Sequence, residues 1–218
     1  MPRRTKQDAQ ATRSLLLDAA EQLFHARGVW RTSLNDIAVA AGTTRGAIYW
    51  HFKDKADLFN AMMERVTLPL EEAVMQVGED QEADPLDEIR GAIRRALRMV
   101  TTDARARRVF EIAMHRVEYV DELVAVKERH LAVRNECMVK IEAGLRLAAQ
   151  RRGVTLALPV RAAALGLHGL VDGLIQNWLL DPPGFNLQTA GMRTTDTYLA
   201  GLGLSVQVAA SDAAEQAA

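Results

Sequence analysis

The sequence has a single cysteine, Cys137, among its 218 residues. One cysteine excludes an internal disulfide and fits a reducing compartment. The basic start MPRRTK has no apolar core segment, so it does not resemble a secretory signal. The most apolar later stretch, residues 162–180, is broken by glycine, asparagine, glutamine, histidine and aspartate, and we predict no membrane span. Together these absences predict a cytoplasmic protein.

The motifs of common enzyme classes are also missing. There is no G-x-S-x-G, H-E-x-x-H, P-loop or G-x-G-x-x-G, so we predict neither an enzyme nor a cofactor. A metal site that combines His115, His130, Cys137 and His168 is conceivable, because His130 and Cys137 are seven residues apart on one helix face. No short ligand pair anchors that set. A metal-binding helical protein or an enzyme is therefore the remote alternative.

The formal net charge of −1 conceals an uneven distribution. Residues 1–55 have nine basic and five acidic side chains, a net charge of +4, and the rest of the chain has a net charge of −5. A basic N-terminal module on an acidic body fits an anionic partner at one end only. An uneven surface without functional meaning is the other interpretation.

Helical periodicity runs through the chain and no long β-alternation interrupts it, which predicts an all-α fold. We expect helices from about Thr12 to Ala26, from Lys55 to a kink or end at Pro69, and from Pro85 after an Asp84 cap. Further helices are expected from Asp103 and over about Val120–Arg151, Pro159–Leu180 and Leu187–Leu204. The predicted parts are a flexible basic arm at 1–11, a DNA-binding domain at 12–55, a ligand-binding and dimerisation domain at 56–204, and a disordered tail at 205–218.

Residues 33–55 have the pattern of two short helices joined by a tight turn. Ser33 is a plausible N-cap, with Asp36 three residues later. Gly42 ends the first helix, and Thr43 or Thr44 can cap the second. Two helices with a short glycine-containing turn form a helix-turn-helix, whose second helix enters the DNA major groove.

The second helix has polar and aromatic side chains on its outer face. Arg45 is the expected base reader, because a guanidinium pairs bidentately with guanine, and Gly46 lets the backbone approach the groove closely. Tyr49 and His51 can donate to phosphate oxygens, and Lys55 would meet phosphate as a point charge. At most one of the two aromatic residues can lie in the core, since Ile48 and Phe52 fill the inward face. The predicted DNA-binding residues are Ser33, Thr44, Arg45, Gly46, Tyr49, Trp50, His51 and Lys55.

The run TSLNDIAVAAGTTRGAIYWHFKDKADLF closely resembles the DNA-binding region of TetR-family transcriptional repressors. The shared pattern is a Gly-x-x-x-Thr-[Ser/Thr] entry from Gly28, an Ala-Gly turn, a Tyr-x-His-Phe helix end and a Phe-x-x-Lys-x-x-Leu continuation from Phe52. This resemblance covers residues 12–60. The segments MPRRTKQDAQATR and VDGLIQNWLL are similar to the branch that represses multidrug efflux-pump operons. The resemblance implies an all-helical homodimer that binds an operator.

The helix expected at 159–180 has a polar ridge of His168, Asp172 and Gln176 at four-residue spacing. A carboxylate among leucines and valines is costly to bury unless something satisfies it. Asp172 either pairs with a neighbouring helix or projects into a pocket that orients an apolar ligand. The resemblance favours the pocket and implies cavity positions at Phe110, Met114, Cys137, Ile141, Val171, Asp172 and Gln176.

The expected mechanism is that a dimer, joined through its last two helices, holds a pseudo-palindromic double-stranded operator. A hydrophobic, drug-like effector then favours a conformation with lower DNA affinity. One alternative is a regulator of metabolism that responds to an acyl-CoA or another metabolite. A nucleoid-type DNA binder without an effector does not fit more than 150 residues behind the DNA-binding module.

Overall fold

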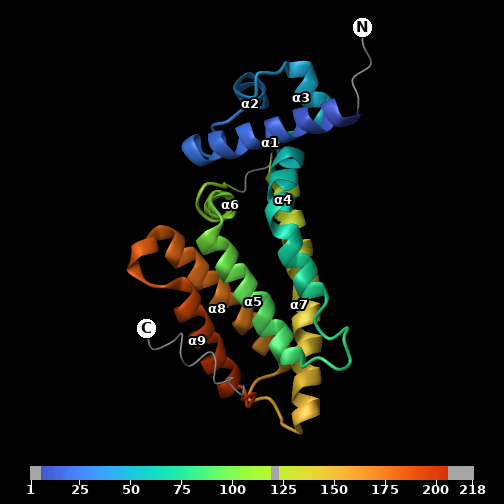
Figure 1. Ribbon diagram of the computed structural model, residues 1–218, viewed down its shortest axis with the longest axis vertical. Coiled ribbons are helices and arrows are strands. Elements are labelled where there is room, and N and C mark those ends of the chain that lie inside the picture. Colours follow the sequence, from blue (N-terminus) through green and yellow to red (C-terminus); the bar gives the residue numbers. More distant parts are fainter. Residues whose placement is uncertain (1–5, 119–122, 206–218) are drawn as a thin grey trace. The chain divides into compact units, whose positions relative to one another are not determined.

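The computed structural model describes residues 6–118 and 123–205, and within them every regular element is helical (Figure 1). The predicted all-α fold is confirmed. The elements are α1 (Lys6–Arg27), α2 (Leu34–Ala40), α3 (Arg45–His51), α4 (Lys55–Met75), α5 (Pro85–Thr102), α6 (Ala104–His115), α7 (Val124–Arg152), α8 (Val160–Leu180), the 3-10 turn η2 (Pro182–Gly184) and α9 (Leu187–Gly201).

The chain forms two compact units, and neither is continuous in sequence. The first unit contains the described residues up to Leu68 together with those between Ala104 and Ala132. The second contains Pro69–Asp103 and the described residues from Val133 onward. The first unit therefore holds α1–α3, the first part of α4, α6 and the start of α7. The second holds α5, α8, α9 and the remaining parts of α4 and α7.

In the first unit, α1 packs against α2, α3 and α6. Leu16 and Phe24 on α1 are buried with Ile37 of α2 and Ile48 of α3. A buried side chain of this size contributes roughly 2 kcal/mol through the hydrophobic effect. Gly28 then ends the helix with φ +83°, a left-handed conformation that glycine adopts without steric cost.

Helix α1 begins at Lys6, six residues before the predicted start at Thr12. Residues 6–11 of the predicted flexible arm are therefore helical, and residues 1–5, with Arg3 and Arg4, lie outside the described part of the chain. The side chain of Thr12 donates to the Asp8 carbonyl at 2.9 Å, as a threonine inside a helix often does.

A buried carboxylate ties α1 to α4 and α6. Glu21 is 2 % exposed and accepts from the guanidinium groups of Arg65 on α4 and of Arg105 and Arg108 on α6, at 2.8 to 3.3 Å. Asp18, one turn earlier, contacts Arg65 and Arg105 at 2.9 Å each. A buried charge is tolerated only when it is paired in this way.

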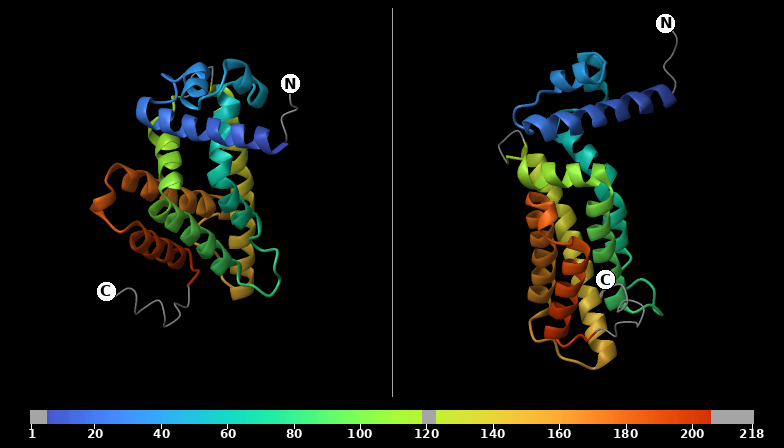
Figure 2. Two further views of the ribbon diagram at one scale, coloured as in Figure 1. Left: turned by 45° about the horizontal axis from the view of Figure 1, so that its top comes forward. Right: turned by 60° about the vertical axis from the view of Figure 1, so that its left-hand side comes forward.

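In the second unit, α5, α8 and α9 pack against one another, and they lie side by side in Figures 1 and 2. Asp84 caps α5 by accepting from the Leu86 N–H at 3.0 Å, as predicted from the Asp-Pro start. Arg90 of α5 donates to both carboxylate oxygens of Asp196 on α9, at 2.7 and 3.0 Å. Helix α7 also contributes to the core of this unit. The core consists of Val77, Leu86, Ile89, Met138, Leu145, Ala148, Ala149, Ala163, Ala164, Leu167, Leu199, Leu202 and Leu204.

Several predicted helix limits differ from the observed ones. Pro69 lies inside α4, which continues to Met75, so proline does not end the helix. Helix α7 begins at Val124, and its predicted start at Val120 lies outside the described residues. The last helix ends at Gly201, and residues 206–218 of the predicted tail also lie outside the described part.

Candidate nucleic-acid interface and effector cavity

Local caps fix the turn between α2 and α3. The Ser33 hydroxyl donates to the Asp36 carboxylate at 2.6 Å and accepts the Asp36 N–H at 3.1 Å. The Ser33 N–H also donates to this carboxylate, at 3.0 Å, and the hydroxyl bond first and the N–H bond second lower the pKa of Asp36. Gly42 has φ +65°, and the Thr44 hydroxyl oxygen accepts the Ala47 N–H at 3.2 Å. Sequence-local hydrogen bonds thus set where α3 begins and in which direction it runs.

Helix α3 buries one side and exposes the other. Ile48 is fully buried, whereas Tyr49 is 49 % exposed and Trp50 is 73 % exposed. Neither aromatic residue lies in the core. Arg45 and Gly46 are exposed at the first turn, beside the exposed cap Thr44, and His51 is half-buried. The exposed face therefore offers a cation, aromatic plates and hydrogen-bond donors to a partner.

Two ring contacts order this exposed face. The Arg45 guanidinium carbon lies 5.7 Å from the centroid of the Tyr49 ring, within the range of a cation–π contact. The Trp50 and His51 rings meet edge to face, with centroids 4.6 Å apart. The side chains that we predict to contact DNA therefore also contact each other.

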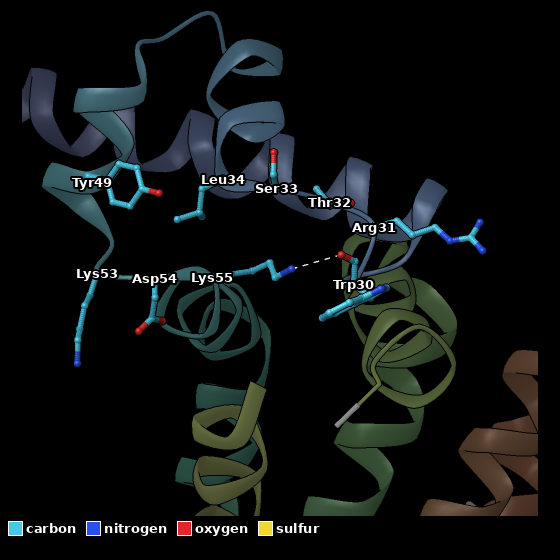
Figure 3. Close-up of a pocket in the computed structure, with 9 residues that line it drawn as sticks. All are labelled: Trp30, Arg31, Thr32, Ser33, Leu34, Tyr49, Lys53, Asp54 and Lys55. Atoms are coloured by element: carbon cyan, nitrogen blue, oxygen red, sulfur yellow. Dashed lines mark hydrogen bonds between the residues drawn. The ribbon is translucent and has the colours of Figure 1, made fainter. Parts of the chain in front are cut away.

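A groove of about 390 Å³ borders this face (Figure 3). Lys55, at its base, is 6 % exposed, and its Nζ donates to the Trp30 carbonyl oxygen at 3.4 Å. The same ammonium lies 5.6 Å from the centroid of the Trp30 ring. This placement disfavours the predicted phosphate contact of Lys55, because its ammonium is buried and contacts Trp30 within the protein.

Two basic residues of the groove were missing from the predicted set. Arg31 and Lys53 are exposed, line the groove with Tyr49, and extend away from it in Figure 3. In the sequence they appeared only in the count of basic residues. Their position next to the helix-turn-helix could have identified them. Arg31 stands two residues before the Ser33 cap, and Lys53 stands two residues after the end of α3.

The second unit has a cavity of about 150 Å³ between the later part of α4 and helices α5, α7 and α8. Of the predicted ligand residues, Ile141, His168, Val171 and Asp172 line it. Sequence reasoning missed the walls from α4 and α5, because nothing in their apolar spacing distinguishes a cavity wall from a core. The remaining lining residues are Leu70, Val74, Val77, Ile89, Ala92, Ile93, Ala96, Leu167 and Ile175.

The predicted polar ridge on α8 divides between two environments. His168 is half-buried at the cavity, Asp172 is exposed at its edge, and Gln176 is exposed and does not line it. Each residue turns an α-helix by about 100°, so a four-residue step leaves a drift of about 40° and two such steps about 80°. The ridge therefore rotates from the cavity to the outer face. Asp172 is not buried, which removes the desolvation cost that we expected.

The other predicted ligand residues do not line this cavity. Phe110 and Met114 are half-buried on α6, in the first unit. Cys137 is half-buried on α7, and burial, followed by the charges of Glu71 and Glu136, raises the pKa of its thiol. This environment favours the protonated thiol over the thiolate. Within residues 6–118 and 123–205, no three His, Cys, Asp or Glu side chains are grouped so that they could hold a metal ion.

No helix in the described part of the chain has the length and apolar character needed to cross a membrane. Residues 16–62 match the profile of "Bacterial regulatory proteins, tetR family", and residues 84–203 match that of "MAATS-type transcriptional repressor, C-terminal region". The second match alone covers more than half of the chain. The chain belongs to the TetR family.

Full-length similarity agrees with this membership. The chain is 40 % identical over 191 residues to the HTH-type transcriptional regulator AcrR of Shigella flexneri, covering 86 % of this chain and 87 % of AcrR. It resembles the crystal structure of NalD, the secondary repressor of the MexAB-OprM multidrug efflux pump in Pseudomonas aeruginosa. The TM-score is 0.82 and the identity 36 %, over 89 % of this chain and 98 % of NalD.

A third relative is SmeT, the repressor of the Stenotrophomonas maltophilia multidrug efflux pump SmeDEF, in its complex with triclosan. The TM-score is 0.77 and the identity 35 %, over 88 % of this chain and 91 % of that one. TetR-family membership makes this protein a transcriptional regulator with a helix-turn-helix, not an enzyme. In TetR terms, α1–α3 are the DNA-binding bundle and α5–α9 belong to the matched C-terminal region.

Proposed function

We propose that this TetR-family protein is a repressor that binds a pseudo-palindromic operator as a dimer and is released by a hydrophobic, drug-like compound. Its operon encodes a multidrug efflux pump, and it acts in the cytoplasm, where the operator is accessible. The observation that carries the DNA-binding part is the exposed face of α3, which presents Arg45, Tyr49 and Trp50 outward. The efflux part is supported by similarity over most of the chain to NalD and SmeT.

In this proposal α3 enters the major groove, and Arg45 reads base edges. Thr44 is exposed, and its hydroxyl proton is available to a phosphate oxygen because the oxygen accepts, rather than donates, in the cap. The Ser33 hydroxyl donates its proton to Asp36 and does not donate it to a phosphate at the same time. Ser33 therefore contributes to this face through its position as the cap of α2. Arg31 and Lys53 replace Lys55 as the phosphate-binding cations, since both are exposed at the groove beside Tyr49.

The effector site is the cavity in the second unit, whose walls are apolar except for His168 and Asp172. Its volume of about 150 Å³ is smaller than the 300–1,000 Å³ typical of ligand pockets. A drug-sized compound must therefore widen it, so that the ligand binds one conformation better than the other. That difference in affinity is the free energy available to lower operator binding, typically about 1–3 kcal/mol, or 5- to 150-fold.

The composition of the cavity wall does not favour an acyl-CoA effector. Acyl-CoA has phosphate groups, which proteins bind with arginine or lysine. The described lining residues include neither.

The proposed dimer forms through α8 and α9. Leu165 and Leu180 of α8 are large apolar side chains exposed in the single protomer. Trp178 and Leu179 of the same helix are buried within the protomer, so they contribute less to this interface.

Two measurements test the proposal. Arg45→Ala should weaken gel-shift binding to the DNA beside the gene by about tenfold or more, the loss expected for a bidentate base contact, while triclosan binding, measured by calorimetry, is unchanged. Unaltered operator affinity would refute the assignment of α3. Asp172→Ala should change the triclosan concentration that releases the operator but not operator affinity itself, and an equal loss of both would indicate a structural role for Asp172.

A further inference from the structure

We propose that the Tyr49 ring is a positioning element for DNA reading, which holds the Arg45 guanidinium in the orientation that meets a base edge. The inference rests on the proposed role of α3 and assigns Tyr49 a task other than a phosphate contact. Its basis is the 5.7 Å separation between the guanidinium carbon of Arg45 and the centroid of the Tyr49 ring.

Helix geometry creates this contact. Arg45 and Tyr49 are four residues apart on α3 and therefore lie on one face. Helical side chains lean toward the N-terminus, so the Tyr49 ring leans over the turn that carries Arg45. The other residue one turn later, Ile48, is fully buried, and Gly46 has no side chain. Tyr49 is thus the side chain of α3 that can support the guanidinium.

Arg45 needs such support because of where it stands. It is the first residue of α3, directly after the Thr44 cap, where the helix dipole disfavours a positive charge. An exposed arginine also has large rotamer freedom, which must be lost before both of its donors can meet one guanine. No hydrogen bond or ion pair holds its guanidinium to any described residue. Contact with the ring restricts the side chain and leaves its N–H donors free for DNA.

The two possible roles of Tyr49 predict different effects on DNA binding when its ring is removed. If the ring positions Arg45, its removal reduces discrimination at the base pair that Arg45 reads. If Tyr49 instead donates its hydroxyl to a phosphate, removal weakens binding by the same factor for every sequence. A cation–π contact at an exposed site corresponds to about a two- to fivefold effect per half-site.

The experiment uses the full chain and a duplex that the unmodified protein selects from a random double-stranded library. Fluorescence anisotropy then measures Kd for that duplex and for each single base-pair substitution of the half-site. The proteins compared are the unmodified chain, Arg45→Ala, Tyr49→Leu and Tyr49→Phe. The position at which Arg45→Ala loses discrimination identifies the base pair that Arg45 reads. Circular dichroism and the thermal midpoint check that each variant is folded.

The expected result is that Tyr49→Leu lowers discrimination about two- to fivefold at that base pair and little elsewhere. Tyr49→Phe, which keeps the ring, should retain the discrimination. Uniform weakening by Tyr49→Leu, or a Tyr49→Phe profile equal to that of Tyr49→Leu, would overturn the positioning role while leaving operator binding intact. An Arg45→Ala profile equal to that of the unmodified protein would instead overturn the proposed function of α3, and this inference with it.

Discussion

Lys53 and Lys55 stand two residues apart but should affect DNA binding in opposite ways. Lys53 is exposed, and its ammonium has no partner among the described residues. Lys55 is buried, donates to the Trp30 carbonyl and lies over the Trp30 ring. We therefore compare Lys53→Gln with Lys55→Gln, because each removes one charge and keeps a long polar side chain.

The salt dependence of operator binding separates the two residues. Each phosphate contact on duplex DNA contributes about 0.9 to the slope of log K against log salt, and a dimer has two copies of each lysine. Lys53→Gln should therefore reduce the slope by about 1.8, so its affinity deficit shrinks roughly 12-fold between 50 and 200 mM KCl. Lys55→Gln should leave the slope unchanged and lower the free energy of unfolding by about 2 kcal/mol, through the lost charged hydrogen bond and cation–π contact.

Anisotropy titrations at four salt concentrations measure both slopes, and urea unfolding measures both stabilities. A reduction of the slope by Lys55→Gln equal to that by Lys53→Gln would show that burial over Trp30 does not keep Lys55 from phosphate. Two unchanged slopes would show that the groove does not face the DNA backbone.

The remaining predictions concern the second unit. Asp196→Ala removes the main partner of the buried Arg90, whose pKa is raised first by the hydrogen bonds it donates to Asp196. We expect this variant to lower the free energy of unfolding in urea by about 2–3 kcal/mol. The control Asp87→Ala, at an exposed partner of the same arginine, should lower it by less than about 1 kcal/mol. A smaller loss in Asp196→Ala than in the control would contradict this role. The pKa of Asp84 is lowered, chiefly by its hydrogen bond from an arginine of α7, so its contribution is present above the unfolded value near pH 4 and is lost as pH falls through the folded value. Unfolding measured from pH 6 to 2 should show this loss in the unmodified protein and not in Asp84→Asn. Thr195 is fully buried, and its hydroxyl has no hydrogen-bond partner among residues 6–118 and 123–205. Thr195→Val should therefore be neutral or stabilise by up to about 1 kcal/mol, and a clear loss of stability would mean that the hydroxyl has a partner.

The helix-turn-helix was predictable because its determinants are local. Ser33, Gly42 and Thr44 each act on residues within five positions of themselves, and the structure has all three as predicted caps or stops. The start of α5 was predictable for the same reason, since Asp84 and Pro85 are adjacent.

The structure departs from these expectations where a segment distant in the sequence determines a residue's environment. Lys55 is buried by Trp30, 25 residues earlier in the chain, and no local pattern announces that contact. Phe110 and Met114 were carried over from a resemblance, but α6 folds with the DNA-binding bundle rather than around the cavity. Asp172 was placed correctly on α8, but its exposure depends on which face the neighbouring helices cover.

The buried Glu21 sets a rule for engineering hybrid repressors. The family match to the DNA-binding region ends at residue 62, but the three arginines that neutralise Glu21 stand at 65, 105 and 108. A chimaera joined at residue 62 inherits the carboxylate from one parent and all of its counter-charges from the other. A mismatch leaves a buried charge unpaired, at a cost of about 3–5 kcal/mol from a total stability of about 5–15 kcal/mol. A DNA-binding region transferred between members of this family therefore needs to include Arg65 and α6, or the recipient needs arginines at those positions.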